Sequence, residues 1–411
     1  MKSTSAFCLA AAFAAAASAP PAFAVQTCEL GGQHVNPANG NTTQGKSGLM
    51  RCREQDTGAV VREQELQNGK FMGVLRYFKA GQVEREHSVD ERGNRDGIAR
   101  EWNVPDSGGA RVLIREETYR DGRNTGVARS WYANAQRQRL TFYGDDDREQ
   151  ASVEFGNDGK LSDLRCASRP VFGADFDDKS ACGFAGAAST VLLYGGKRQP
   201  VARIVIERGE RRKVESLWEN GAARELRKTS AAGVLERRFA ADGTLLREVQ
   251  SVPARPAAAA GERTRHVKVL EQEFHESGKR VHELRWLPND DSGAERVSES
   301  RWYLNGQPKS RTEHEHTAGR VLRRETNFHD NGKPSFEGAW SIGGGASGTR
   351  HDRSERATGV HKGFDEQGRL RSEQVHDERG RVSRERVFDE RGALLCDDEL
   401  FEDGSRKSSA R

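Results

Sequence analysis

The chain has 411 residues, of which 31% are charged, and its formal net charge at pH 7 is +4. Positive and negative side chains are interleaved, as in Arg384-Glu385-Arg386, so no basic stripe is available to neutralise the phosphates of a nucleic acid. After the first residues no stretch approaches the ~20 apolar residues of a membrane helix, so we expect no span of that kind.

The N-terminus has the pattern of a secretory signal peptide. Lys2 supplies a positive charge, residues 7–17 form an apolar run, and Ala22-Phe23-Ala24 is a small-x-small cleavage site. We therefore predict that residues 1–24 are removed after Ala24 and that the mature protein is periplasmic or secreted. This removal lowers the net charge from +4 to +3, because Lys2 is the only charged residue lost.

Cysteine spacing predicts two local disulfides in the mature chain. An oxidising compartment allows disulfides to persist, and the pairs Cys28 with Cys52 and Cys166 with Cys182 close short loops. Each bridge is worth roughly 3 kcal/mol in the chain-entropy account. Cys396 is left free or bridges two chains. A metal site is less favoured, because no two cysteines are two to four residues apart.

Glycines mark a repeated unit along most of the chain. They recur every twelve residues at Gly69, Gly81 and Gly93 and again at Gly368, Gly380, Gly392 and Gly404, and every thirteen at Gly306, Gly319 and Gly332. An aromatic residue precedes many of the repeat glycines by four positions: Tyr77, Phe155, Phe239, Phe274, Trp302, Phe328, Phe364 and Phe388. An aliphatic residue follows by two, as in Val83 or Leu370.

This unit predicts β-hairpins. Asn or Asp precedes many of the glycines, as in Asn68-Gly69 and Asn305-Gly306, and such dipeptides tolerate the positive φ angles of tight turns. A glycine at each repeat would cost a helix about 1 kcal/mol. The strands carry charges on both faces, whereas a sandwich needs a continuous apolar face. We therefore predict an all-β fold, an elongated antiparallel sheet of tandem β-hairpin repeats, possibly in two arrays. Facing Arg and Glu should pair at roughly 0.2–1 kcal/mol each.

The repeats divide the mature chain into four predicted parts. Residues 25–66 form an N-terminal cap that contains Cys28 and Cys52. Residues 67–250 form a first repeat array with a disulfide-pinned insertion near 165–200. Residues 251–262 form a Pro/Ala linker. Residues 263–407 form a second repeat array.

The fuller repeats resemble a known family. Residues 68–78 (NGKFMGVLRYF) and 121–132 (DGRNTGVARSWY) share an acidic or amide residue before Gly, a second Gly four positions later, and then an aromatic. This pattern is similar to the variant MORN repeats of bacterial toxin–antitoxin-associated, YwqK-type proteins, over 68–160 and more loosely over 215–404. The resemblance implies a hairpin-built sheet and a binding or scaffolding role without catalytic residues. Residues 364–370 and 388–394 resemble the Tyr-Asp repeats of Rhs shells.

Few residues indicate chemistry. His314 and His316 on one strand face resemble half of a metal site, and the acids at 145–147 and 175–178 resemble calcium ligands. No further ligand completes the histidine pair, and neither acidic run has the spacing of a calcium-binding loop, so we interpret them as a solvated strand and loop acids. We predict no catalytic residue, no metal and no cofactor.

These features favour an interaction protein over an enzyme. Tyr and Trp dominate many binding hot spots, so Trp102, Tyr132, Trp218 and Tyr303 are the predicted contact surface. Because strand residues alternate between faces, we expect Trp131 to face the core and Tyr132 the opposite side. The expected partner is a protein or a cell-envelope component. Two alternatives are an antitoxin or immunity protein that neutralises a toxin, and a secreted polysaccharide-acting enzyme, which would need convergent acids in one cleft.

Overall fold

The structure is a computed structural model that describes residues 26–254, 264–289, 293–317, 320–343 and 355–409. The predicted signal peptide and most of the predicted linker, residues 255–262, lie outside the described residues. The chain divides into two compact units, here called unit 1 and unit 2, and the division in sequence falls between Gly159 and Lys160. Within the described ranges no helix has the length and apolar character needed to cross a membrane.

The first sheet has thirteen strands in the order β13-β12-β11-β10-β8-β7-β6-β5-β4-β3-β1-β2, and the short β9 pairs with β8. A 3-10 helix, η1 (Gly40–Thr42), lies between β2 and β3. The strand bounds are β1 Gln26–Leu30, β2 Gln33–Val35, β3 Gly48–Glu54, β4 Val60–Gln67, β5 Lys70–Lys79, β6 Gln82–Val89, β7 Gly97–Asn103, β8 Val112–Arg120, β9 Arg123–Asn124, β10 Gly126–Trp131, β11 Arg137–Tyr143, β12 Glu149–Phe155 and β13 Leu161–Arg165.

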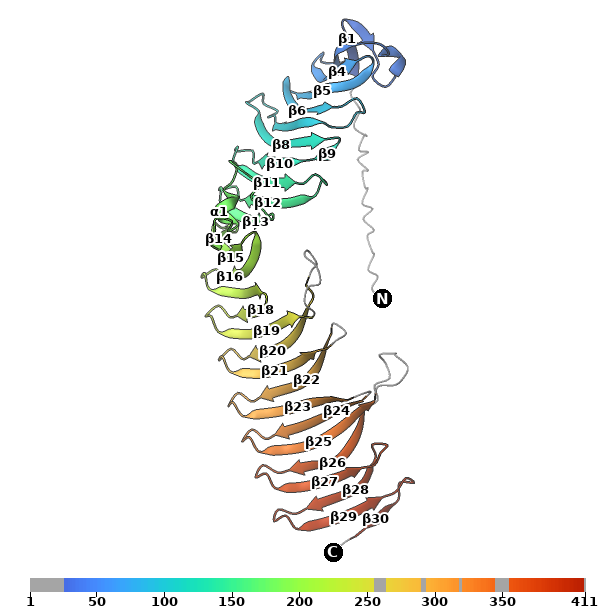
Figure 1. The fold of residues 1–411 in the computed structure, drawn as a ribbon, viewed down its shortest axis with the longest axis vertical. Helices are drawn as coiled ribbons and strands as arrows, with labels where there is room; N and C mark the ends of the chain where they lie inside the picture. The colour runs from blue at the N-terminus through green and yellow to red at the C-terminus, as the bar shows by residue number, and fades with distance from the viewer. Residues whose placement is uncertain (1–25, 255–263, 290–292, 318–319, 344–354, 410–411) are drawn as a thin grey trace, which may run out of the picture. The chain divides into compact units, whose positions relative to one another are not determined.

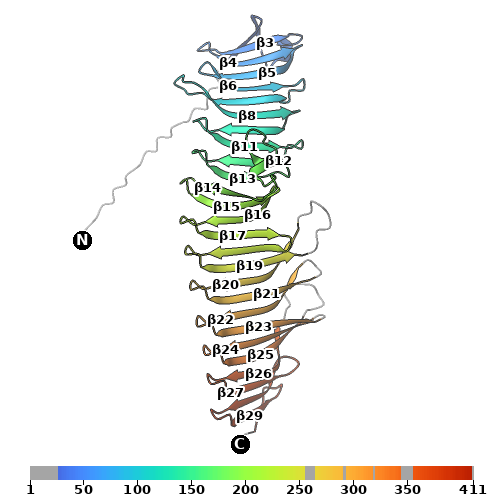
Figure 2. The ribbon, with the colours of Figure 1, turned by 60° about the vertical axis from the view of Figure 1, so that its left-hand side comes forward.

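The second sheet has seventeen strands, and each pairs antiparallel with the strand before and after it in sequence (Figures 1 and 2). A four-residue helix, α1 (Asp178–Ala181), precedes it. The strand bounds are β14 Ser189–Tyr194, β15 Pro200–Glu207, β16 Glu210–Leu217, β17 Ala223–Ser230, β18 Gly233–Phe239, β19 Leu245–Pro253, β20 His266–Phe274, β21 Arg280–Pro288, β22 Ala294–Trp302, β23 Pro308–Thr317, β24 Arg320–Phe328, β25 Pro334–Gly343, β26 Glu355–Phe364, β27 Leu370–His376, β28 Val382–Phe388, β29 Leu394–Leu400 and β30 Arg406–Ser408. The predicted all-β fold of antiparallel hairpins is confirmed.

The Asn/Asp-Gly dipeptides form two kinds of turn. Asn68 and Gly69 both have positive φ, 50° and 80°, as a two-residue hairpin turn requires. At Asn305-Gly306 only the glycine is in the positive region, with φ 90°. There the Asn305 Oδ1 atom accepts a hydrogen bond of 2.9 Å from the backbone N–H of Gln307. The Asn305 side chain therefore stabilises the turn as a hydrogen-bond acceptor. Positive φ, which the dipeptide pattern predicted for both residues, is found only at Gly306.

Apolar burial is concentrated near the start of the chain. In unit 1, Cys28, Leu30, Val35, Met50, Cys52 and Leu66 form a buried cluster. In unit 2, Val267 is the last buried aliphatic residue in sequence, and the buried residues described after it are Glu283, His361 and Asp398. Strands β21–β30 are thus a single layer, in which sequential strand pairing replaces a core.

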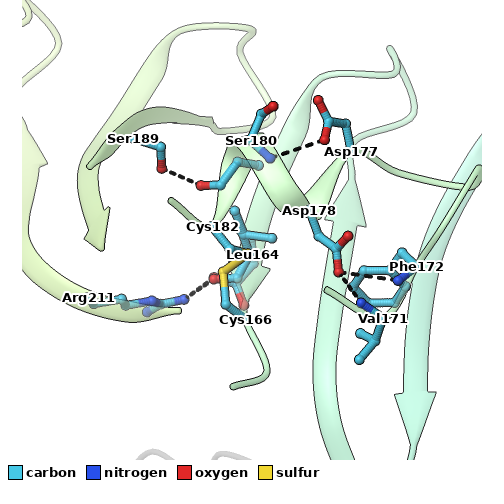
Figure 3. Close-up of a disulfide and its surroundings, with 12 residues drawn as sticks. Leu164, Cys166, Val171, Phe172, Asp177, Asp178, Ser180, Cys182, Ser189 and Arg211 are labelled. Carbon is cyan, nitrogen blue, oxygen red and sulfur yellow. Dashed lines mark hydrogen bonds and ion pairs between the residues drawn. A yellow bond between two sulfur atoms is a disulfide. The ribbon is translucent and has the colours of Figure 1, made fainter. Parts of the chain in front are cut away.

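Both predicted disulfides are present, and Cys396 is a free thiol. Cys28 and Cys52 lie directly opposite each other on β1 and β3. Cys166 and Cys182 tie the segment between β13 and β14 to the end of α1 (Figure 3). Disulfides are typical of oxidising compartments, so the two bridges suggest an extracytoplasmic location.

The segment around α1 is held by one buried carboxylate. Asp178 Oδ2 accepts hydrogen bonds from the backbone N–H groups of Val171 at 2.6 Å and Phe172 at 3.2 Å (Figure 3). Asp177 caps α1 by accepting from the N–H of Ser180 at 3.1 Å. These two acids of the 175–178 run therefore hold backbone N–H groups, and Asp178 does so as a buried residue of α1, not as a loop acid.

Candidate binding surface

A ladder of alternating charges crosses unit 1. The residues Arg51, Glu63, Arg76, Glu86, Arg100, Glu116 and Arg129 stand directly opposite one another on successive strands from β3 to β10. Ion pairs follow this order, as in Arg51–Glu63 at 2.8 Å and Arg76–Glu86 at 2.6 Å. Opposed residues share a face, so the pairs lie on one side of the sheet, called the ladder face below.

Unit 2 has a ladder of the same kind. Direct opposition links Arg237 with Glu248 and, toward the C-terminus, Lys362 with Glu373, Arg386 and Asp397. Arg237 and Glu248 form an ion pair at 2.7 Å, in which the glutamate side chain is 10% exposed and the arginine 40%. The glutamate side chain is thus less exposed to solvent than that of its arginine partner. The predicted cross-strand Arg–Glu pairing is confirmed.

An aromatic row borders the ladder of unit 2. Its members follow a ladder position by two residues on the same strand, and therefore share the ladder face: Phe239, Phe274, Trp302, Phe328, Phe364 and Phe388. Each is half-buried. Successive members lie one hairpin apart, about 10 Å, because neighbouring strands are 4.7–4.9 Å apart. The row presents apolar surface at regular intervals. The ladder-face position two residues earlier is charged before Phe239, Phe364 and Phe388 and uncharged before the other three members.

Three of the four predicted contact residues each donate a hydrogen bond to the backbone carbonyl of a phenylalanine. The Tyr132 hydroxyl donates to the carbonyl of Phe155 at 2.8 Å, the Trp218 indole N–H to that of Phe239 at 3.2 Å, and the Tyr303 hydroxyl to that of Phe328 at 3.0 Å. Each bond links the turn that carries the Tyr or Trp to the phenylalanine at the end of a later strand. The fourth, Trp102, lies under the Arg111 guanidinium at 4.2 Å. All four are half-buried, so their role in binding stays a prediction.

The expected contrast between Trp131 and Tyr132 is weaker in the structure. Both residues are half-buried, so the structure does not enclose one of them and expose the other. Both also line a hollow of about 670 Å³ over β8, β10 and β11, together with Arg115, Glu117 and Arg139. Ala128 and Ser130, two residues apart on β10, are small side chains of its lining. The sequence did not reveal the hollow, because strand register decides which residues of β8 and β11 lie beside them.

The carboxyl groups with a shifted pKa all shift in the same direction. Each carboxyl group in the described part whose pKa is shifted has a lowered pKa, which is the reverse of what a general acid needs. Burial alone would raise the pKa of Glu283, but bonds from Gln272 and Arg285 and the charge of Arg280 lower it further than burial raises it. In the described ranges no three His, Cys, Asp or Glu side chains are grouped to hold a metal ion.

One histidine pair carries a pH dependence. The rings of His361 and His376 have centroids 4.1 Å apart, and Trp340 lies 4.6 Å from His361. Burial, followed by the neighbouring His361, lowers the pKa of His376 below its usual 6.5. The folded state therefore holds this proton more weakly than the unfolded state does.

We expect the stability of unit 2 to fall as the pH drops below 6.5. The His376 contribution is complete above the unfolded pKa and is lost as the pH falls through the lower folded pKa. His376→Gln should flatten this fall in melting temperature between pH 7 and pH 5.5. His275→Gln, at an exposed turn position, should follow the wild type. Equal slopes for wild type and His376→Gln would refute this assignment.

Comparison with known proteins adds little. No protein-family model matches the chain, and no curated protein matches it. Among solved structures, TcdB2-TccC3 is similar at 12% identity and a TM-score of 0.18, over 88% of this chain. The chain spans 19% of the length of that protein. A porin-like protein from Bacteroides uniformis is similar at 8% identity and a TM-score of 0.14, over 71% of this chain and 92% of its own.

Proposed function

We propose that the chain is an exported, non-catalytic scaffold that binds a protein or a cell-envelope component along the ladder face. The observation that carries the proposal is the aromatic row of unit 2, where half-buried rings recur at each hairpin on the ladder face. Half-exposed aromatic side chains supply large apolar contact area, which is the usual source of binding energy at interfaces.

Three further features support the proposal. The predicted signal peptide and the two disulfides fit a periplasmic or secreted protein. The resemblance to variant MORN repeats implies a binding role. The ladder carboxylates are paired with arginines across the strands, which leaves them as charged borders of a contact surface and not as acid–base groups.

The test compares the ladder face with the opposite face in strands β22–β28. A row variant carries Trp302→Ala, Phe328→Ala and Phe364→Ala, and its control carries Arg301→Ala, Asn327→Ala and Val387→Ala on the opposite face. Mature proteins are mixed with purified peptidoglycan and, separately, with periplasmic extract, and bound material is quantified. We expect the row variant to lose at least tenfold in binding to one of the two, with the control unchanged and both variants folded by circular dichroism. Equal binding by both variants would contradict the proposal.

A further inference from the structure

A second hollow lies on the face of unit 2 opposite to the ladder. It has a volume of about 350 Å³ and is lined by residues of β16–β19. Val214, Leu226 and Val249 are its apolar lining, and Val249 is 4% exposed. The polar lining includes Ser216, four arginines and two acids, namely Arg227, Arg237, Arg238, Arg247, Glu225 and Glu236. This volume is at the lower end of the range for small-ligand pockets, roughly 300–1,000 Å³.

The charge pattern of this hollow departs from that of the ladders. Arg238 and Arg247 are directly opposite each other on β18 and β19. Like charges in that position destabilise a sheet, and the ladders place Arg opposite Glu instead. On the same face, Arg227 stands opposite Glu236 and forms an ion pair with it. The Arg238–Arg247 pair therefore lowers the local stability of the sheet, and its presence requires an explanation.

Two polar groups of the hollow, the Arg238 side chain and the Ser216 hydroxyl, have no hydrogen-bond partner among the described residues, whereas Arg247 has one. Arg247 donates from Nε, at 2.9 Å, and from a second nitrogen to one and the same carboxylate oxygen of Glu271 on β20. The exposed side chain of Arg238 makes no hydrogen bond or ion pair with any described residue, although Glu225 stands opposite it on β17. The Ser216 hydroxyl is buried and has no hydrogen-bond partner among the described residues. Unpaired buried polar atoms cost stability, and a bound ligand removes that cost.

We infer that this hollow binds an oxyanion, the carboxylate or phosphate group of a small ligand, between Arg238 and Arg247. The planar guanidinium groups match the geometry of such an anion. The Ser216 hydroxyl is available as a further donor, and the valine lining contacts the carbon skeleton of the ligand. The site belongs to unit 2 and the opposite face, so it does not depend on the scaffold role proposed for the ladder face.

Calorimetric titration of the mature protein tests the site. The probes are galacturonate for a carboxylate, glycerol 3-phosphate for a phosphate, and neutral galactose as the control ligand. The wild type should bind one of the two anions and not galactose. Arg238→Gln should weaken that binding at least tenfold, whereas Glu225→Gln should strengthen it a few-fold by removing a nearby negative charge. Arg301→Gln, on the same face and bound to Glu299, should change it less than twofold.

Thermal melting gives a second measurement, in which Arg238→Gln should keep or raise stability while it weakens anion binding. Arg238→Gln removes one of two opposed like charges, so its melting temperature without ligand should equal or exceed that of the wild type. A gain in stability with a loss of anion binding supports the site. The inference is overturned if neither anion binds the wild type, if galactose binds as well as the anions, or if Arg238→Gln binds like the wild type. None of these results bears on the aromatic row, which is tested separately.

Discussion

Leu66→Ala should destabilise unit 1 by about 2–5 kcal/mol, the usual cost of emptying a buried leucine site. Leu66 is 2% exposed and lies in the cluster formed with Met50 and the Cys28–Cys52 disulfide. The cavity cannot collapse easily, because the disulfide fixes two of its walls. Hydrogen exchange of the β3–β5 amides and urea unfolding of the mature protein would measure the loss.

Leu395→Ala is the matched control for this experiment. The same side chain is 57% exposed on β29, in the single-layer part of unit 2. We expect its removal to change stability by less than about 0.5 kcal/mol, as for most surface substitutions. Comparable losses for Leu66→Ala and Leu395→Ala would mean that burial does not set stability in this array.

Asp178→Ala should cost about 3 kcal/mol and loosen the segment between β13 and β14. Its carboxylate, on a residue 4% exposed, is the acceptor for the backbone N–H groups of Val171 and Phe172. A hydrogen bond to a charged group contributes about 1.5–3 kcal/mol, and its loss leaves a buried donor unpaired. The Cys166–Cys182 bridge keeps the segment tethered, so we expect local opening and not global unfolding.

The Asp178→Asn variant removes the negative charge but keeps an oxygen atom that can accept hydrogen bonds. Both bonds end on Oδ2, and asparagine can place its single carbonyl oxygen there, so this variant should lose about 1 kcal/mol. Limited proteolysis within residues 167–181, followed by peptide mapping, would report the opening. Cleavage of Asp178→Ala no faster than that of the wild type would show that the carboxylate does not hold the segment.

Much of the fold could be predicted because its period is short. Gly306 and Gly332 each end a strand through a local turn, so the spacing of such residues marks strands without long-range information. The disulfides followed from proximity in sequence for the same reason. The charge ladder was predicted as a type of contact, but not residue by residue. Whether Arg76 faces Glu86 or its neighbour depends on register, which bulges shift by one residue at many hairpin ends.

The hollows could not be predicted for the same reason. Arg238 and Arg247 are nine positions apart in sequence, and only the shift between Arg238 and Phe239 makes them direct neighbours. The structural role of Tyr132, Trp218 and Tyr303 was also missed. Their polar atoms donate to carbonyl groups 21–25 residues away, at strand ends that no local pattern identifies as neighbours.

Sequential pairing in unit 2 has a consequence for how the chain acquires its fold. Every strand from β14 to β30 pairs with the strands next to it in sequence, so the contact order is low and hairpins can form early and independently. A polypeptide that becomes available from its N-terminus can close each hairpin on the preceding one as soon as both strands have appeared. During such growth the unpaired edges of this sheet are those of β14 and of the newest strand.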